Sequence, residues 1–177
     1  LHTAYRRQRQ MCIETDIDDR PTVIRYSKDP IPDDIRIVTS HDGLDVLCDG
    51  PEDGILLVAH GQLCAEALAA VDQLDSPVRV VSPRWSLPVC GGLIEEAARA
   101  RAVVSVEDGL VVSGLGSHLA DALSQRGMWR PIRSLGIPQR YLDHDSRSAI
   151  MAELGLDSRG IADAVSQLVA QLDGEYS

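Results

Sequence analysis

The stretch Val103–Leu123, VVSVEDGLVVSGLGSHLADAL, decides the fold class of this chain. Its first residues form a short β-branched apolar run, which is typical of a strand buried on both faces. The tripeptide Glu-Asp-Gly at 107–109 predicts a turn that stops this strand. The glycine turn at 113–116 leads into an amphipathic helix, with Ser117 as the expected N-cap and Gly127 just past its end. Strand, glycine turn and helix form the repeating step of an α/β sheet.

The glycine turn at 113–116 has two interpretations. It could cradle a phosphate, because the free N–H groups and the dipole at the start of a helix attract anions. It could instead be a turn that needs positive φ and close packing of strand against helix. A dinucleotide-binding fingerprint requires a third glycine where this chain has Leu119, and no acidic residue ends a strand about 20 residues later. We therefore favour the packing turn.

The rest of the chain alternates between short apolar runs and amphipathic segments. The Asp-Gly pair at 42–43 is a hairpin signal, and Asp157 is a plausible N-cap for the last helix. The pattern predicts an α/β fold with a mostly parallel open sheet and helices on both faces. We expect strands at 22–26, 36–39, 44–48, 55–59, 78–81, 102–106 and 132–137, and helices at 2–14, 61–74, 93–101, 118–126, 146–154 and 157–172.

A composition change near residue 30 predicts a domain boundary. Residues 27–34 hold two prolines and three aspartates, which is the composition of a linker. We assign residues 1–28 to the end of a preceding α/β domain, 29–35 to the linker and 36–177 to the main domain. The chain begins inside a predicted helix and without a methionine, so we interpret it as a fragment.

Composition excludes several classes of function. The net charge of −10 disfavours binding to nucleic acid or to an anionic membrane surface. No apolar run approaches the roughly 20 residues of a membrane span. The four cysteines are widely spaced without a Cys-x-x-Cys pair, so we expect small buried thiols in a reducing cytosol rather than zinc or redox chemistry.

Three further groups of residues could carry chemistry. His144 stands between two aspartates, but neighbours in an extended segment point in opposite directions, so we favour a histidine hydrogen-bonded within its loop over a metal site. His60 follows a predicted central strand and could face a ligand or simply start a helix. Ser113, Ser117 and His118 lack the Gly-x-Ser-x-Gly pattern of a nucleophile elbow.

Four segments together resemble the C-terminal part of transketolase-like thiamine diphosphate enzymes, and most of all the 1-deoxy-D-xylulose-5-phosphate synthase family. The final segment is the most specific of them, and the segments occur in the family's order. Ser82, Leu87, Ser27 and Asp29 depart from the family pattern. The segments are PTVIRY at 21–26, VRVVSPRWSLPV at 78–89, VSVEDGLVVSGLGSHLADAL at 104–123 and RSLGIPQRYLDHDSRSAIMAELGLDSRGI at 133–161.

The resemblance implies an enzyme that condenses pyruvate with glyceraldehyde 3-phosphate, for isoprenoid precursor and thiamine biosynthesis. It also implies a cytoplasmic homodimer that uses thiamine diphosphate and magnesium. The family's Gly-Asp-Gly motif and its asparagine segment, which hold magnesium and the diphosphate, are not present in this sequence. We therefore expect no catalytic, metal-binding or cofactor-binding residue here, no turnover by the fragment alone, and a role in contacts with the N-terminal domains. A transketolase, a 2-oxo acid dehydrogenase β subunit and a free-standing binding module are the alternatives.

Two residues receive an expected role. Arg25 lies near the carboxyl end of the predicted strand at 22–26, where a guanidinium could bind a phosphate or pair with Asp18 or Asp19. The resemblance favours the first, because the family's arginine at this position looks like a ligand of the aldehyde substrate's phosphate. Glu107 resembles a recurring glutamate of this domain type, and we expect a structural role for it, bonding nearby N–H groups or a partner domain's edge.

Overall fold

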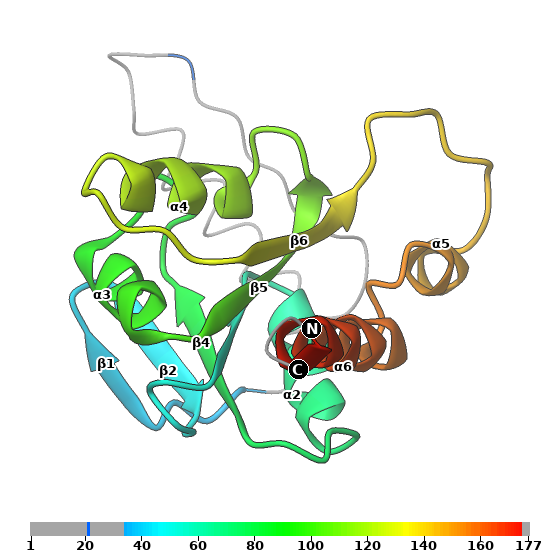
Figure 1. Ribbon diagram of the computed structural model, residues 1–177. Helices are drawn as coiled ribbons and strands as arrows, with labels where there is room; N and C mark the ends of the chain where they lie inside the picture. Colours follow the sequence, from blue (N-terminus) through cyan, green and yellow to red (C-terminus); the bar gives the residue numbers. More distant parts are fainter. Residues whose placement is uncertain (1–20, 22–33, 175–177) are drawn as a thin grey trace. The chain divides into compact units, whose positions relative to one another are not determined.

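The computed structural model describes Pro21 and residues 34–174. The fold below is that of the unit beginning at Ile35. Its centre is a six-stranded sheet in the order β1-β2-β4-β3-β5-β6 (Figure 1). β3 to β6 run parallel, and β1 and β2 are antiparallel additions at one edge, which confirms the predicted mostly parallel open sheet. The strands are β1 Thr39–His41, β2 Leu44–Cys48, β3 Ile55–Ala59, β4 Val78–Pro83, β5 Ala102–Leu110 and β6 Ile132–Ile137.

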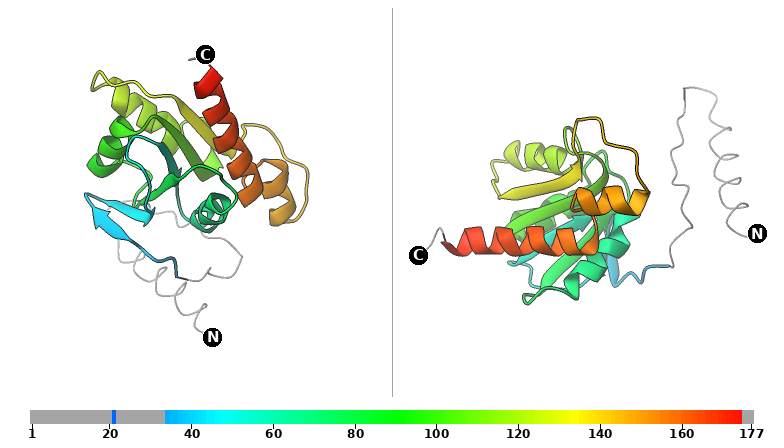
Figure 2. Two further views of the ribbon diagram at one scale, coloured as in Figure 1. Left: turned by 60° about the horizontal axis from the view of Figure 1, so that its bottom comes forward. Right: turned by 90° about the vertical axis from the view of Figure 1, so that its right-hand side faces the viewer.

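Helices cover both faces of the sheet, as predicted. α2 and α6 pack together on one face and α3 and α4 lie on the other, an arrangement that Figures 1 and 2 both display. Within the described part of the chain, no helix is both long enough and apolar enough to cross a bilayer. The helices are α2 Leu63–Val71, α3 Gly91–Arg99, α4 Leu115–Ser124, α5 Arg147–Glu153 and α6 Ser158–Gly174.

The core divides into two layers because side chains alternate along each strand. Leu57 and Val104 face α2 and α6, whereas Leu56 and Val103 face α3 and α4. All five residues of β3 are buried, as expected of the central strand. Each fully buried Leu or Val contributes roughly 1.5–3 kcal/mol to folding, so the aliphatic core needs no aromatic residue.

The hairpin between β1 and β2 forms as predicted. Asp42 and Gly43 both have positive φ, 41° and 78°, which is the conformation that a two-residue hairpin turn requires. Leu44 pairs with His41 across this turn. The first strand is displaced from its predicted range of 36–39 to Thr39–His41, because the pairing register follows the turn.

The prediction that Glu-Asp-Gly stops the strand at 107–109 is wrong. β5 continues to Leu110, which pairs with Ile137 of β6. The register shifts between Val106 and Leu110, so the extra residues on β5 form an irregularity of the bulge type. Pairing with β6 therefore keeps residues 107–110 in the sheet, and it places Glu107 at the carboxyl edge of the sheet.

The prediction that Ser117 caps the following helix is also wrong. α4 begins at Leu115, three residues before the predicted start at residue 118, with Gly114 as N-cap and no side-chain cap hydrogen bond. The hydroxyl of Ser117 instead donates to the carbonyl oxygen of Val111 over 3.1 Å. The other end agrees with prediction, because Gly127 has a φ of 68° just past the helix.

The predicted N-cap of the last helix is confirmed. The carboxylate of Asp157 accepts a hydrogen bond from the backbone amide of Gly160 over 2.9 Å. A second contact was not predicted: Glu66 of α2 accepts a hydrogen bond from the amide of Ser158, also over 2.9 Å. This contact joins the start of α6 to α2 on the same face of the sheet.

A buried ion pair lies between the sheet and α3. Arg79 of β4 and Glu96 of α3 are 9% and 3% exposed, and two hydrogen bonds of 2.9 and 3.2 Å join them. Asp49 also contacts Arg79. The paired geometry compensates for burial of both charges. The sequence reading did not identify this pair.

Candidate functional site

Arg25, the predicted ligand of a substrate phosphate, lies outside the described residues. So do the predicted helix at 2–14, the predicted strand at 22–26, most of the linker and Cys12. These assignments remain predictions. The candidate site below is therefore built from the unit that begins at Ile35.

The topology selects the carboxyl edge of the sheet as the place for a site. The chain leaves β3 through α2 on one face and leaves β5 through α4 on the other. β3 and β5 are neighbours in the sheet, so their carboxyl ends diverge to opposite faces. Open α/β sheets collect ligands at such a switch point. The residues that follow these two strands are His60 and, at the irregularity of β5, Glu107.

The start of α4 is closed by Glu107. A Cβ atom added to Gly114 would overlap Oε1 of Glu107 and lie 2.6 Å from the carbonyl oxygen of Leu110. The carboxylate thus sits against the N-terminus of the helix, where a negative charge is stabilised by the helix dipole. A phosphate would need the same position and would be repelled by this carboxylate. We therefore reject the phosphate-cradle interpretation of the glycine turn.

The packing interpretation of the same turn made two claims. Its close packing of strand against helix is confirmed, but its positive φ at a glycine is wrong. Gly114 has a φ of −83°, and the positive φ in the turn, 60°, belongs to Ser113. Close packing is what requires glycine: a Cβ on Gly116 would overlap the hydroxyl oxygens of Ser105 and Ser134. These serines are paired neighbours on β5 and β6, directly beneath the start of α4.

Glu107 has an unusual electrostatic environment. Burial raises its pKa above the ordinary value, and this effect exceeds the opposing influence of the backbone amides of Leu115 and Gly116. The charges of His60 and His118 also act to lower the pKa. Although these amides face the carboxylate, its buried Oε1 accepts no hydrogen bond of ordinary geometry from the described residues. The carboxylate is therefore only partly compensated.

His60 is held by the neighbouring strand. Its Nδ1 lies 3.1 Å from the carbonyl oxygen of Pro83, at the end of β4. A carbonyl oxygen can only accept, so Nδ1 carries the hydrogen and Nε2 is left as an acceptor when the ring is neutral. The backbone amide of His60 also donates to the carbonyl oxygen of Val106, which ties the β3–α2 turn to β5.

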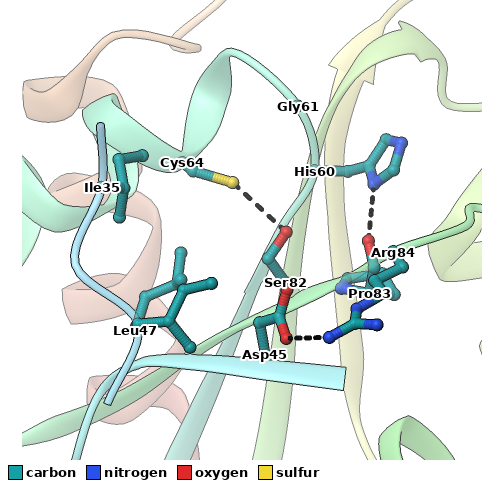
Figure 3. A pocket seen from close by; sticks show the side chains of 10 residues that line it. Ile35, Asp45, Leu47, His60, Gly61, Cys64, Ser82, Pro83 and Arg84 are labelled. Atoms are coloured by element: carbon teal, nitrogen blue, oxygen red, sulfur yellow. Dashed lines mark hydrogen bonds and ion pairs between the residues drawn. The ribbon is translucent and has the colours of Figure 1, made fainter. Parts of the chain in front are cut away.

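A pocket opens on the other side of His60, at the carboxyl ends of β3 and β4 (Figure 3). It has a volume of about 310 Å³. One wall is apolar, from Ile35, Ile37 and Leu47, and the other is polar. Asp45, His60, Cys64, Ser82 and Arg84 supply the polar side chains, and Gly61 and Pro83 complete the lining.

The polar wall of the pocket is internally paired. Figure 3 shows Cys64 pointing toward Ser82, with a separation of 3.4 Å, and Arg84 pointing toward Asp45, also at 3.4 Å. Burial raises the pKa of the Cys64 thiol, an effect that the bond to Ser82 only partly opposes. A thiol held in this state is a poor nucleophile. Cys64 is therefore not activated as a nucleophile.

The remaining sequence candidates are not brought together. His144 is exposed and makes no hydrogen bond within the described residues, so the predicted loop hydrogen bond is wrong. The neighbouring Asp145 instead accepts from the amide of Ser146. No cluster of three metal-ligating side chains occurs in the described ranges. The hydroxyl of Ser117 is engaged by a carbonyl oxygen and lacks a base.

One contact at this edge was missed by sequence reasoning. Asp108 pairs with Arg147 of α5 over 3.0 Å, which connects the end of β5 to a helix 39 residues later. The sequence offered only the basic residue beside Ser146 as a signal. The free cysteines agree partly with expectation, since Cys64 is buried but Cys48 and Cys90 are half-buried.

Known proteins share both the sequence and the fold of this unit. The model of the transketolase C-terminal domain family matches residues 44–161. The chain is 42% identical over 168 residues to 1-deoxy-D-xylulose-5-phosphate synthase 2 of Streptomyces avermitilis, with 91% of this chain and 26% of that protein covered. It is 40% identical to the synthase of a Mycobacterium species over 163 residues, covering 89% of the chain and 26% of that protein. The chain thus spans about a quarter of the length of these relatives.

Solved structures give the same fold. A structure described as a split-gene transketolase in an inactive β4 tetramer has a TM-score of 0.61 and 29% identity, over 73% of this chain and 42% of that chain. A transketolase of Pichia stipitis has a TM-score of 0.55 at 18% identity, over 75% of this chain and 19% of that one. The second likeness supports the fold alone.

Proposed function

The chain belongs to the transketolase C-terminal domain family, and we propose that it forms the C-terminal part of a 1-deoxy-D-xylulose-5-phosphate synthase. The observation that carries this proposal is the agreement of relatives with that name over nine-tenths of the chain. In the complete cytoplasmic enzyme, pyruvate is decarboxylated and its two-carbon unit is added to glyceraldehyde 3-phosphate. The product feeds isoprenoid precursor and thiamine biosynthesis.

Thiamine diphosphate and magnesium belong to the complete enzyme in this proposal, and the described residues do not fit them. A diphosphate needs free N–H donors and a cation held by carboxylate and carbonyl oxygens. The start of α4 is the obvious N–H donor site, and the carboxylate of Glu107 fills it. The cofactor is therefore expected on the preceding domains, and no reaction step is assigned to residues of this unit.

A contact role for this unit is supported by its carboxyl edge. Trp85 follows β4, Leu110 ends β5, and Tyr141 follows β6, and these side chains are 73%, 50% and 102% exposed. Aromatic and large apolar residues at an edge that also carries ionic groups are typical of protein–protein contact surfaces. The surface would contact the N-terminal domains and the second subunit of a homodimer.

A domain exchange tests this proposal. The segment of the Streptomyces avermitilis synthase that aligns with residues 36–177 of this chain is replaced by those residues. The chimera should form 1-deoxy-D-xylulose 5-phosphate from pyruvate and glyceraldehyde 3-phosphate within about tenfold of the parent rate, a barrier difference of about 1.4 kcal/mol. The parent truncated before this domain serves as the inactive control. A folded, dimeric chimera without synthase activity would contradict the proposal.

Transketolase is the second candidate, because the split-gene structure comes from that class and shares 29% identity. Two chimeras separate the two functions: residues 36–177 replace the aligned segment of the synthase in one and the aligned segment of a transketolase in the other. Because this unit is proposed to act through contacts with the preceding domains, the synthase proposal predicts activity with pyruvate in the first chimera and little activity with a ketose-phosphate donor in the second. The reverse pattern would favour the second candidate.

Arg25 is the one substrate ligand that we propose, on the basis of the family resemblance of PTVIRY. In the complete enzyme, Arg25→Ala would remove a charged hydrogen bond to the phosphate of glyceraldehyde 3-phosphate, worth roughly 1.5–3 kcal/mol. The kcat/KM for that substrate should fall about ten- to a hundredfold, while the KM for pyruvate stays unchanged. Arg36→Ala, beyond the linker, is the matched control. Equal losses of kcat/KM for glyceraldehyde 3-phosphate and pyruvate would contradict this role and would favour a salt bridge of Arg25 with a neighbouring aspartate.

A further inference from the structure

The pocket beside the start of α2 has the size and the position of a site for a small ligand. Its volume of about 310 Å³ lies at the lower end of the range for small-molecule sites, roughly 300–1,000 Å³. It lies at the carboxyl ends of the parallel strands β3 and β4, the edge where open α/β sheets bind ligands. Binding at this place therefore needs no rearrangement of the sheet.

The two sides of this pocket differ in chemistry. Figure 3 shows Ile35 and Leu47 on one side, and His60 and Arg84 on the other. Ile37 also lines the pocket, and its side chain is 49% exposed. A ligand that fits both sides therefore combines an apolar body with a polar head.

Arg84 has hydrogen-bond donors to spare at this pocket. Its Nη2 lies 3.4 Å from Asp45, a contact longer than an ordinary hydrogen bond, and Asp45 already accepts from the hydroxyl of Ser40 over 2.6 Å. Among the described residues, no acceptor contacts Nε or Nη1 of Arg84. The guanidinium can therefore bind an oxyanion with the rest of its N–H groups.

Two further groups favour a negatively charged head. The hydroxyl of Ser82 accepts from the thiol of Cys64 over 3.4 Å, which leaves its own hydrogen free to donate to a ligand. The start of α2 also borders the pocket, no side chain caps it, and Gly61 has open space where a Cβ would stand. The positive end of the helix dipole lies here, and no carboxylate fills it as Glu107 fills the start of α4.

The charges around the pocket favour a single negative charge on the ligand. Of the described residues that line it, Arg84 alone carries a permanent positive charge, and Asp45 offsets part of that charge. A phosphate monoester carries a charge of about −1.5 to −2 at neutral pH, whereas a carboxylate carries one. One partly neutralised guanidinium therefore suits a carboxylate better than a phosphate.

We propose that this pocket binds a small monocarboxylate, whose carboxylate is held by Arg84 and Ser82 beside the start of α2 and whose apolar body packs on the opposite wall. The role is binding and not catalysis, because Cys64 is not activated as a nucleophile. This inference goes beyond the proposed synthase function and does not depend on it, since it uses neither the cofactor nor Arg25.

Titration of the 177-residue chain with isovalerate, followed by two-dimensional NMR at constant ionic strength, tests the site. The amides of Gly61, Cys64 and Ser82 should shift saturably with a Kd of about 1 mM, an affinity within reach of a ligand of this size. The amides of Leu115 and Gly116, at the closed start of α4, should not shift. The absence of a saturable shift at the first three amides would overturn the proposal.

Three further probes separate the parts of the ligand. Isovaleramide has the same shape without the charge, and acetate has the charge without the branched apolar body. Each should bind at least about tenfold more weakly than isovalerate. Inorganic phosphate should also bind at least about tenfold more weakly, because it lacks the apolar body and carries more charge. Binding of any of the three as tight as that of isovalerate would overturn the assignment of a monocarboxylate.

Matched pairs of surface variants place the ligand in the pocket. Arg84→Gln should weaken isovalerate binding about tenfold, whereas Arg126→Gln, at an exposed arginine just past α4, should leave it unchanged. Ile37→Ser should weaken binding about threefold by removing part of the apolar wall. Val38→Ser, at an adjacent exposed residue outside the pocket lining, should not weaken it. Equal effects within either pair would overturn the proposal.

Discussion

Two helices start at the same edge of the sheet, and their first turns differ in what fills them. α4 follows β5 through a turn with Gly114 and Gly116, and the carboxylate of Glu107 closes its N-terminus. α2 follows β3 through Gly61, which has a φ of 64° and open space where a Cβ would stand. No side chain caps α2, and its start borders the pocket shown in Figure 3.

The difference shows that a glycine-rich turn before a helix is not by itself an anion site. The turn that looks like a phosphate cradle is occupied by the protein's own carboxylate, carried there by the irregularity in β5. The turn before α2, which has the single glycine Gly61, is the one with open space at its glycine. Its glycine is required by backbone conformation, whereas those of α4 are required by contact with neighbouring atoms.

Gly116→Val should have the largest effect on stability. Its side chain would overlap the hydroxyl groups of Ser105 and Ser134 beneath α4, and neither serine side chain is long enough to move aside. We expect a loss of about 3 kcal/mol in the free energy of unfolding, the upper range for overpacking. Urea denaturation followed by circular dichroism measures it. An unchanged midpoint would show that α4 does not pack closely here.

Gly114→Ala should come next, with a loss of about 2 kcal/mol from the clash with Glu107 and the carbonyl oxygen of Leu110. The second change Glu107→Ala should recover part of that loss, because it removes one of the two clashing groups. The coupling in this double-mutant cycle, measured by the same denaturation experiment, should be about 1 kcal/mol. Additive effects would indicate that the carboxylate does not sit against Gly114.

Gly61→Ala should have the smallest effect, about 1 kcal/mol, because only the left-handed backbone conformation is strained and the added methyl group has room. Its loss should not change when Glu107 is also replaced. A loss larger than that of Gly114→Ala would reverse the contrast between the two helix starts. Thermal unfolding of the three glycine variants in parallel gives the ranking.

Much of the fold was predictable from the sequence because local signals agreed with the global topology. The continuous apolar run at 55–59 became the central strand, and Asp42-Gly43 became the hairpin turn. The carboxyl half of β5 was missed because its pairing with β6 is a tertiary contact that overrides the turn propensity of Glu-Asp-Gly. The buried pair of Arg79 and Glu96 was missed for the same reason, since nothing local marks the partner of a charged residue.

The candidate site was less predictable than the fold. Glu107 and His60 were each noticed in the sequence, but their convergence depends on the order of strands in the sheet, which sequence periodicity does not give. The capping residue was assigned to Ser117 because a hydroxyl at that position fits the usual N-cap pattern. The carboxylate that closes the helix instead comes from the strand before it, eight residues before Leu115.

Titration of the 177-residue chain with thiamine diphosphate and Mg²⁺ tests the central claim most directly. The start of α4 is closed by Glu107, and we place the cofactor site on other domains. Two-dimensional NMR should therefore show no saturable shift of the Leu115 and Gly116 amides. Calorimetry should show no binding of thiamine diphosphate at concentrations up to about 1 mM, so any binding free energy is weaker than about −4 kcal/mol. Micromolar binding, accompanied by saturable shifts at these two amides, would contradict the account.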